Sequence, residues 1–413
     1  MINFKNDAKK KLNEIKKDII NLSHTIHKTP ELAFKEVNAA ANIIEILKKS
    51  NFNIEEGICD LPTAFKATIG NGSLHIAICA EYDALPGIGH ACGHNIIAAS
   101  AVGSAIALSE FVNELDLTIS VIGTPAEESG GGKILMLERG GFNGIHAAMM
   151  IHPAPVDMIC PSIIACSDIE VRFYGKESHA SSSPELGINA QDALTISQIS
   201  IGLLRQHIIS FDRIHGTPLI VGKAPNVIPH YVTARYLIRS STLKELKSLQ
   251  KRVIACFEAG AIATGCKFKI IEKELPYANM IHDTDLAKLY KQNAESLGRV
   301  FIDDLSNAKP KTFIEKIFLF LLRQAGISGK DLEPMLKRFP GSTDMGNISQ
   351  TIPSIHPMIG IQSMPAVNHQ LEFTKACIEP PADDAVIDGA LSMAYTAIDI
   401  ANNKSLKHRL CKK

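Results

Sequence analysis

The chain has 413 residues, which is too long for one compact core, so we expect two domains. Its 43 Lys and Arg residues balance 43 Asp and Glu residues, so the net charge gives no reason to propose a nucleic-acid partner. The longest apolar run, at 317–322, is too short to span a bilayer, and the lysine-rich start shows no secretory signal pattern. Nine scattered cysteines form no disulfide framework. We therefore expect a cytoplasmic protein without a nucleic-acid or membrane partner.

Strands alternate with helices in the first part of the chain. Two amphipathic helices are expected between residues 8 and 49. Apolar, β-branched runs then predict strands over 74–79, 117–122 and 147–151, separated by helices over 96–109 and 133–138. This alternation predicts an α/β fold with a doubly wound, mainly parallel sheet.

The pattern changes near residue 168. The expected elements are helices over 188–207 and 243–263 and strands over 169–174, 219–221, 231–239 and 268–272. Their order, βαββαβ, is that of a ferredoxin-like split unit. We therefore predict a catalytic domain formed by 1–167 and 281–413, interrupted by a smaller α+β domain at 168–280.

The most informative segment is His-Ala-Cys-Gly-His at 90–94, which follows a turn at 81–87. The Cys92 thiolate and the His94 imidazole can face one point in space, as a Zn²⁺ ion requires. The alternative is a buried cysteine beside a helix-capping histidine. The glycine between the two side chains favours the metal site, because it loosens the backbone where two ligands converge.

Other polar clusters also follow predicted strands. Glu127 and Glu128 lie in the turn after strand 117–122, and His152 follows strand 147–151. Adjacent carboxylates are more often a solvated helix start, but beside a metal one can bind the ion while the other acts as a base. Taken singly, His152, Asp83 and His369 are more often structural. Ligands of such sheets bind beyond the carboxyl ends of the strands, which favours a single site.

Together these motifs resemble a known enzyme family. The motifs are Asp-Ala-Leu-Pro-Gly at 83–87, His-Ala-Cys-Gly-His at 90–94, Glu-Glu at 127–128, Ile-His-Pro at 151–153 and the late His369. Their order and spacing resemble the binuclear metallopeptidase and amidohydrolase family of aminoacylases, hippurate hydrolases and carboxypeptidases. The segments 81–87 and 341–347 are most similar to the branch of p-aminobenzoyl-glutamate hydrolase and the Xaa-Arg or β-alanyl-lysine dipeptidases.

The resemblance implies two divalent metal ions whose ligands are Cys92, His94, Glu128, His152 and His369. Cys92 would bridge the ions, with both His94 and His152 on one and both Glu128 and His369 on the other. Glu127 would be the general base, and Asp83 would orient a ligand. Mixed S, N and O ligands suit Zn²⁺ best, while Mn²⁺, Co²⁺ or Ni²⁺ also fit.

For the inserted domain, the resemblance implies a lid that also forms a homodimer. His179 would reach the neighbouring subunit's site and stabilise the tetrahedral oxyanion. Asn226 and Arg239 would line the substrate side, near a carboxylate. The alternative for the segments 175–180 and 222–229 is a pair of simple hairpin loops, which their Gly, Pro and Asn residues suit.

These expectations describe a metal-dependent hydrolase that cleaves a peptide or N-acyl amide bond. The substrate would be small and carry a carboxylate, as a dipeptide or an aminobenzoyl-glutamate does. Three alternatives stay open: an N-acyl amino acid deacylase, a metal-binding protein without catalysis, and a hydrolase with Cys92 as nucleophile. Two features depart from the family: Glu81 stands where many relatives have a histidine ligand, and the apolar stretch 309–339 is unusually long. That stretch predicts either an extra packed helix or a changed site mouth.

Overall fold

The computed structural model describes residues 4–301 and 341–412, which divide into two compact units. The first unit contains 4–162, 280–301 and 347–412, and the second contains 163–279 and 341–346. Residues 341–346 pack with the second unit, although the sequence grouped them with the first. The apolar stretch 309–339 lies outside the described residues.

A six-stranded sheet forms the centre of the first unit, in the order β1-β2-β4-β3-β5-β11. β3, β4, β5 and β11 run parallel, and β1 and β2 add an antiparallel edge. The strand bounds are β1 Asn53–Glu56, β2 Phe65–Ile69, β3 Leu74–Ala80, β4 Leu117–Gly123, β5 Ala147–Met149 and β11 Ser354–Ile355. β6 His152–Ala154 and β12 Met358–Gly360 form a separate, two-stranded parallel sheet. This is the mainly parallel α/β sheet that the sequence predicts.

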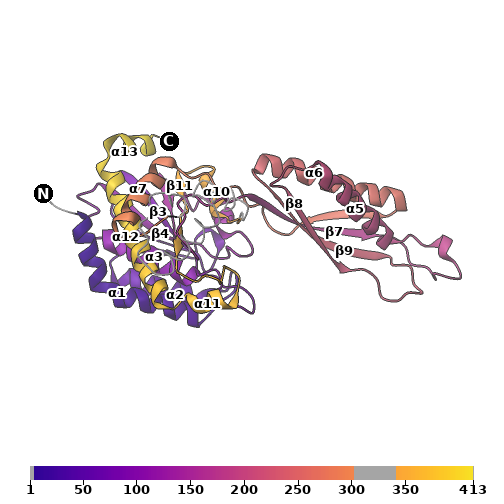
Figure 1. Cartoon of the computed structure of the whole chain (residues 1–413), viewed down its shortest axis with the longest axis horizontal. Helices are drawn as coiled ribbons and strands as arrows, with labels where there is room; N and C mark the ends of the chain where they lie inside the picture. Colours follow the sequence, from indigo (N-terminus) through magenta and orange to yellow (C-terminus); the bar gives the residue numbers. More distant parts are fainter. Residues whose placement is uncertain (1–3, 302–340, 413) are drawn as a thin grey trace, which may run out of the picture. The chain divides into compact units, whose positions relative to one another are not determined.

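Helices cover this sheet, and the central one is α3, in which every residue is buried. α1 and α12 pack against α3, which itself contacts β3 and β4 (Figure 1). Gly103 permits this close packing, because a Cβ there would lie 3.1 Å from a Leu12 methyl group and 3.2 Å from Ala390. The helices are α1 Phe4–Lys28, α2 Val37–Lys49, α3 His94–Leu108, α4 Gly132–Glu138, α7 Thr284–Ser296, α10 Met345–Ser349, α11 Leu371–Ala376, α12 Pro380–Asn402 and α13 Lys404–Cys411, with a 3₁₀ turn at Ile58–Asp60.

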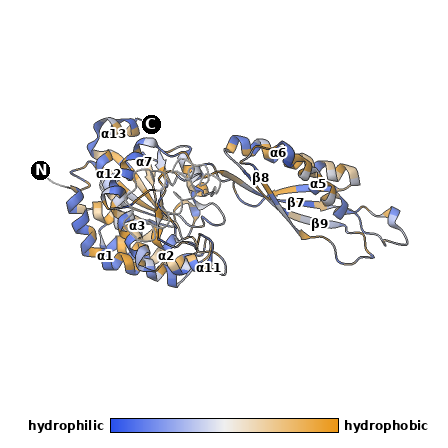
Figure 2. Cartoon of the chain, viewed as in Figure 1, coloured by the Kyte–Doolittle hydropathy of each residue, from blue (hydrophilic) through white to orange (hydrophobic). Residues whose placement is uncertain are grey.

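The outer helices are amphipathic. In α1 the residues Leu12, Ile19 and Ile26 are fully buried, and they recur at the spacing that places them on one helix face. Figure 2 shows the resulting mixture of polar and apolar residues along α1. Of the helices in the described part of the chain, none combines the length and the hydropathy needed to cross a bilayer.

The second unit is a four-stranded antiparallel sheet with two helices. Its strand order, β10-β7-β9-β8, and its βαββαβ chain order are those of a ferredoxin-like unit. The elements are β7 Ala165–Tyr174, α5 Ala190–Leu204, β8 Arg213–Ile220, β9 Tyr231–Ser240, α6 Leu243–Thr264 and β10 Lys267–Glu272, with 3₁₀ turns at Pro184–Leu186 and Arg205–His207.

The prediction of a strand at 219–221 was wrong in its bounds, since β8 begins at Arg213. β8 is an edge strand, and nearly all of its residues are exposed. An exposed edge strand needs no apolar alternation, so its first half carries no strand signal in the sequence.

Candidate metal centre

The polar segments after β3 and β4 lie side by side because these strands are parallel neighbours. Ala80 and Gly123, their last residues, are partners in the register. The Thr124 N–H and its hydroxyl both donate to the Ala80 carbonyl, at 2.8 and 3.0 Å. The turn that carries Asp83 is thereby joined to the turn that carries Glu127 and Glu128.

The thiol and imidazole of the central motif lie at the start of α3. Gly93 precedes the helix with φ +76°, a left-handed conformation that favours glycine. A Cβ at this position would also lie 2.4 Å from the Pro153 ring. Gly93 therefore allows Cys92 and His94 to approach the segment that carries His152.

The five predicted ligands gather in one place. The Cys92 Sγ lies 3.4 Å from His152 Nε2 and 3.5 Å from His369 Nε2. The Glu128 Oε1 lies 3.6 Å from His369 Nε2 and 3.9 Å from His94 Nε2. Ligand atoms of Cys92, His94 and His152 lie within 4.8 Å of one another, as do those of Cys92, Glu128 and His369. Cys92 is thus common to two ligand groups, and Glu81, His94 and Glu127 form a third.

Asp83 contacts one residue of each of the two ligand groups that contain Cys92. Its Oδ1 lies 2.9 Å from His94 Nδ1, and its Oδ2 accepts the Glu128 N–H at 2.9 Å. Burial alone would raise the pKa of Asp83, but His94 and the Glu128 N–H bring that pKa below its usual value. Asp83 and Glu81 raise the pKa of His94, so the metal-free imidazole carries a proton on both nitrogens. Asp83 would hold the Nδ1 proton when a bound cation displaces the proton on Nε2, which leaves the tautomer that a metal ligand needs.

The residues fit a pair of divalent ions. Three buried atoms that face this cluster have no hydrogen-bond partner among the described residues: Glu81 Oε2, His94 Nε2 and Glu128 Oε1. Burial lowers the pKa of His152 to about 4, so its imidazole is neutral and able to donate a lone pair. Burial and Glu128 raise the pKa of the Cys92 thiol, so a thiolate there requires a nearby cation. The same shift argues against Cys92 as an unassisted nucleophile.

A buried ion pair supports the cluster from one side. Lys133 Nζ, on α4, lies 2.5 Å from Glu81 Oε1, and both side chains are fully buried. The other oxygen, Glu81 Oε2, lies 3.5 Å from His94 Nε2. Glu81 therefore lies between the Lys133 ammonium on one side and His94 of the cluster on the other.

We expect Lys133→Met to lower the free energy of unfolding by about 3–5 kcal/mol, because the Glu81 carboxylate would stay buried without this counter-ion. The chain has no Trp, so circular dichroism in urea is the suitable measurement. The matched control is the double variant Lys133→Met/Glu81→Leu, in which an apolar pair should recover most of the loss. Equal losses in the single and double variants would contradict this explanation.

In the second unit, the structure brings two of the three predicted residues together. The Ala180 N–H donates to the Asn226 carbonyl at 2.9 Å, beside a β-bridge between His179 and Val227. Arg239 lies near the other end of β9, where it donates to the Ser342 hydroxyl at 2.8 Å. At ~3.4 Å per residue, about 27 Å of strand separates Arg239 from Tyr231, the end of β9 nearest to His179.

Sequence reasoning missed several residues that surround the cluster. Lys133 and Glu36 are buried charged side chains, and His356 is a buried imidazole whose ring centroid lies 5.3 Å from that of His152. Neither nitrogen of His356 has a hydrogen-bond partner among the described residues. Each stands alone in the sequence, in a segment without a motif. A hydrophilic residue inside a predicted buried element, as Lys133 is in α4, was the one available signal.

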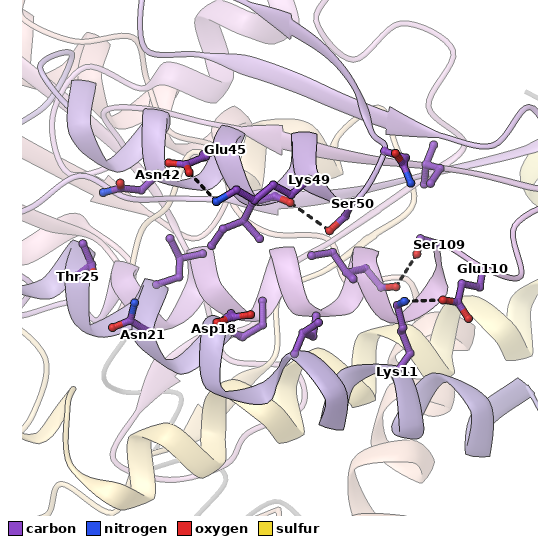
Figure 3. Close-up of a pocket in the computed structure, with 17 residues that line it drawn as sticks. Lys11, Asp18, Asn21, Thr25, Asn42, Glu45, Lys49, Ser50, Ser109 and Glu110 are labelled. Carbon is purple, nitrogen blue, oxygen red and sulfur yellow. Dashed lines mark hydrogen bonds and ion pairs between the residues drawn. The ribbon is translucent and has the colours of Figure 1, made fainter.

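A separate hollow of about 670 Å³ lies between α1, α2 and the end of α3 (Figure 3). Its lining residues form two ion pairs. Lys11 Nζ lies 2.5 Å from Glu110 Oε1, and Lys49 Nζ lies 2.6 Å from Glu45 Oε1. None of its lining residues is a histidine or a cysteine. The hollow therefore offers neither the ligands nor the nucleophile of the predicted chemistry, which belongs to the Cys92 cluster.

Comparison with known proteins agrees with this geometry. Residues 77–382 match the model of peptidase family M20/M25/M40. The chain is 33% identical to the Xaa-Arg dipeptidase of Mus musculus over 412 residues, which cover 96% of this chain and 89% of that protein. It is 32% identical to one of the subunits of p-aminobenzoyl-glutamate hydrolase from Escherichia coli, over 57% of this chain and 53% of that protein.

Solved structures share the fold. A dinuclear metal-binding peptidase of family M20 from Bacillus subtilis aligns with a TM-score of 0.65 and 21% identity, covering 94% of this chain and 99% of that one. An aminobenzoyl-glutamate utilization protein from Klebsiella pneumoniae aligns with a TM-score of 0.66 and 15% identity, covering 94% and 97%. The fold and the cluster define a metal-dependent hydrolase that acts on amide bonds. The chain belongs to peptidase family M20/M25/M40.

Proposed function

We propose that this protein hydrolyses the amide bond of a dipeptide or N-acyl amino acid that carries a free carboxylate. The observation that carries the proposal is the sharing of Cys92 by two ligand groups, with the Glu127 carboxylate alongside them. A single structural metal would need only one such group and no second carboxylate. Two groups joined by one thiolate suit a pair of ions that act on one substrate.

The proposed metal ligands are Cys92, His94, Glu128, His152 and His369. When bound, two ions would supply a Lewis acid and lower the pKa of a water molecule. The mixed S, N and O donors favour Zn²⁺, and Mn²⁺, Co²⁺ and Ni²⁺ are the other candidates. The His369 side chain is 56% exposed, so the cluster opens to solvent on that side.

Glu127 is the proposed general base. Its side chain is nearly buried, and its Oε2 lies 3.9 Å from His94 Nε2. From there the carboxylate can take the proton of the attacking water and return it to the leaving amine. Asp83 keeps His94 in the tautomer described above, so its contribution is orientation.

His179 is the proposed oxyanion donor. The N–H groups of Ser181 and Ser182 both donate to its Nδ1 at 3.3 Å, which leaves the proton on Nε2 at the exposed end of the ring. An N–H donor of this kind suits a tetrahedral oxyanion. Asn226, which is held next to it, and Arg239 are the proposed contacts of the substrate, with the Arg239 guanidinium on its carboxylate.

The separation within the second unit argues for a homodimer. His179 and Arg239 lie near opposite ends of a sheet whose strand β9 is about 30 Å long. One small substrate cannot reach both ends, so one of the two residues must come from a second subunit. The proposed dimer surface is the exposed edge strand β8, which ends at Ile220 and is followed by Val221; each of these two residues is 46% exposed.

The cytoplasm is the proposed compartment. None of the nine cysteines, all of which lie within the described ranges, forms a disulfide. This matches a reducing environment. A metal-bound Cys92 thiolate would also survive best there, because thiolates oxidise more readily than thiols.

The test is a panel of dipeptides and N-acyl amino acids, assayed with the metal content measured in the same sample. Dipeptides ending in Arg or Lys, aminobenzoyl-glutamate and N-acetyl amino acids represent the named relatives. We expect dialysis against a chelator to abolish hydrolysis and a divalent ion to restore it, while far-UV circular dichroism stays unchanged. Hydrolysis that persists in metal-free protein would favour Cys92 as the nucleophile.

A further inference from the structure

The turn that carries Glu127 and Glu128 is strained at one residue. Ala126 has φ +60°, a left-handed conformation that costs energy in any residue with a Cβ. Its carbonyl accepts the Gly131 N–H at 3.1 Å, so the turn is closed on one side by the start of α4. The N–H of Ala126 is held by a residue from a distant part of the sequence.

That residue is Glu36, a fully buried carboxylate at the start of α2. Its Oε1 accepts the N–H of Ala126 at 2.9 Å and the N–H of Phe34 at 2.8 Å. Phe34 is also left-handed, with φ +61°. One oxygen therefore holds two strained turns together. The other oxygen, Oε2, accepts the Thr63 hydroxyl at 2.9 Å, which fixes the direction of the carboxylate.

We infer that Glu36 is a positioning residue that aims the Glu127 carboxylate and the Glu128 ligand at the metal cluster. The inference rests on the proposed function for Glu127. Without Glu36, the N–H of Ala126 would lose its acceptor and the turn could relax toward an unstrained conformation. Glu127 and Glu128 follow directly, so both would move. Glu36 itself is not a catalytic residue, because its two oxygens are occupied by the turn and by Thr63.

A conservative change separates the hydrogen-bonding role of Glu36 from its negative charge. In Glu36→Gln, the amide oxygen can still accept from Ala126 and Phe34, and the amide nitrogen can donate to the Thr63 hydroxyl. We expect Glu36→Gln to resemble the wild type. We expect Glu36→Ala to lower kcat by about 10–100-fold, with little change in KM, and to weaken metal binding by a similar factor through Glu128. Direct titration of the metal-free protein with Zn²⁺ or Mn²⁺ gives the second number without any substrate.

Three further variants keep the test decisive. Glu31→Ala removes a neighbouring carboxylate that accepts the N–H groups of Asn38 and Ala39, at 3.1 and 2.9 Å, and has no part in the Glu127 turn. It should reduce stability and leave kcat and metal affinity unchanged. Adding Ala126→Gly to Glu36→Ala should restore part of kcat and part of the metal affinity, because glycine adopts the left-handed conformation without strain. Should Glu36→Ala fail to fold, Thr63→Val, which removes one bond to the carboxylate, should give a smaller loss of the same two quantities.

The outcomes distinguish this inference from the proposed function. If the wild type hydrolyses the substrate panel but Glu36→Ala changes neither kcat nor metal affinity, the inference is wrong and the function stands. The inference is also wrong if Glu36→Gln is as damaged as Glu36→Ala. If the wild type hydrolyses nothing, yet Glu36→Ala alone weakens metal binding, the function is wrong and the positioning of the turn stands.

Discussion

Replacing Glu127 with Gln should lower kcat by about 10²–10⁴-fold while the protein keeps its fold and both metal ions. The amide has the size and the buried position of the carboxylate but cannot take a proton. The change therefore removes the proposed base and leaves the five ligands untouched. Steady-state kinetics on the best substrate of the panel, metal analysis and circular dichroism measure the three quantities.

The matched control is the next residue, Glu128→Gln. Glu128 Oε1 lies 3.6 Å from His369 Nε2 in the second ligand group, so this change should reduce the metal content along with the rate. A Glu127→Gln variant that keeps its rate would remove Glu127 from the mechanism. One that loses metal would make Glu127 a ligand, as its proximity to both Glu81 and His94 allows.

Most of the cluster could be predicted from the sequence, for a physical reason. The parallel strands β3 and β4 end at neighbouring positions, and the residues directly after them are Glu81–Asp83 and Thr124–Glu128. Both strands are apolar, β-branched runs, and their predicted ends lie within one residue of the observed ends. Once the strand ends are known, the topology of a parallel sheet brings the following side chains together.

His369 shows what periodicity alone cannot supply. It lies in a loop before α11, where its N–H donates to the Ala91 carbonyl at 2.8 Å and its φ is +70°. No sequence pattern fixes such a long-range contact. The resemblance to a known family predicted this ligand, and the residues themselves did not.

The supporting residues could not be predicted, because they act through distant contacts. Glu36 holds Ala126 through a hydrogen bond between residues far apart in the chain, and Lys133 neutralises Glu81 in the same way.

The exposed edge strands were also predicted poorly: β1 was missed, and β8 was given the wrong bounds. β1 and β8 carry exposed residues, and the apolar alternation that marks a buried strand is weak in both. The parallel strands β3, β4 and β5 at the centre of the sheet were therefore predicted, and the strands on either side of them were not.

The proposed shared site makes a prediction that only a dimer can satisfy. His179→Ala and Glu127→Gln should each be nearly inactive alone, with the first expected to lose about 10²–10³-fold in kcat. After the two variants are mixed and their subunits exchanged, activity should return to about a quarter of the wild-type value. Half of the dimers would then be mixed, and each mixed dimer would hold one complete site, with Glu127 from one protomer and His179 from the other.

We expect mixing to restore activity because of the distance between the two ends of the second unit. About 27 Å of β9 separates Arg239 from the end of the strand nearest to His179, so in the proposed site a substrate bound at Arg239 would meet the His179 of a partner. If His179 served its own protomer, each mixed dimer would contain two defective sites and no activity would return. The control is the pair Glu127→Gln and Glu128→Gln, which damages the same part of the site and should not complement in either arrangement. Light scattering before and after mixing confirms that dimers are present, and a monomeric mass at the assay concentration would contradict the shared site directly.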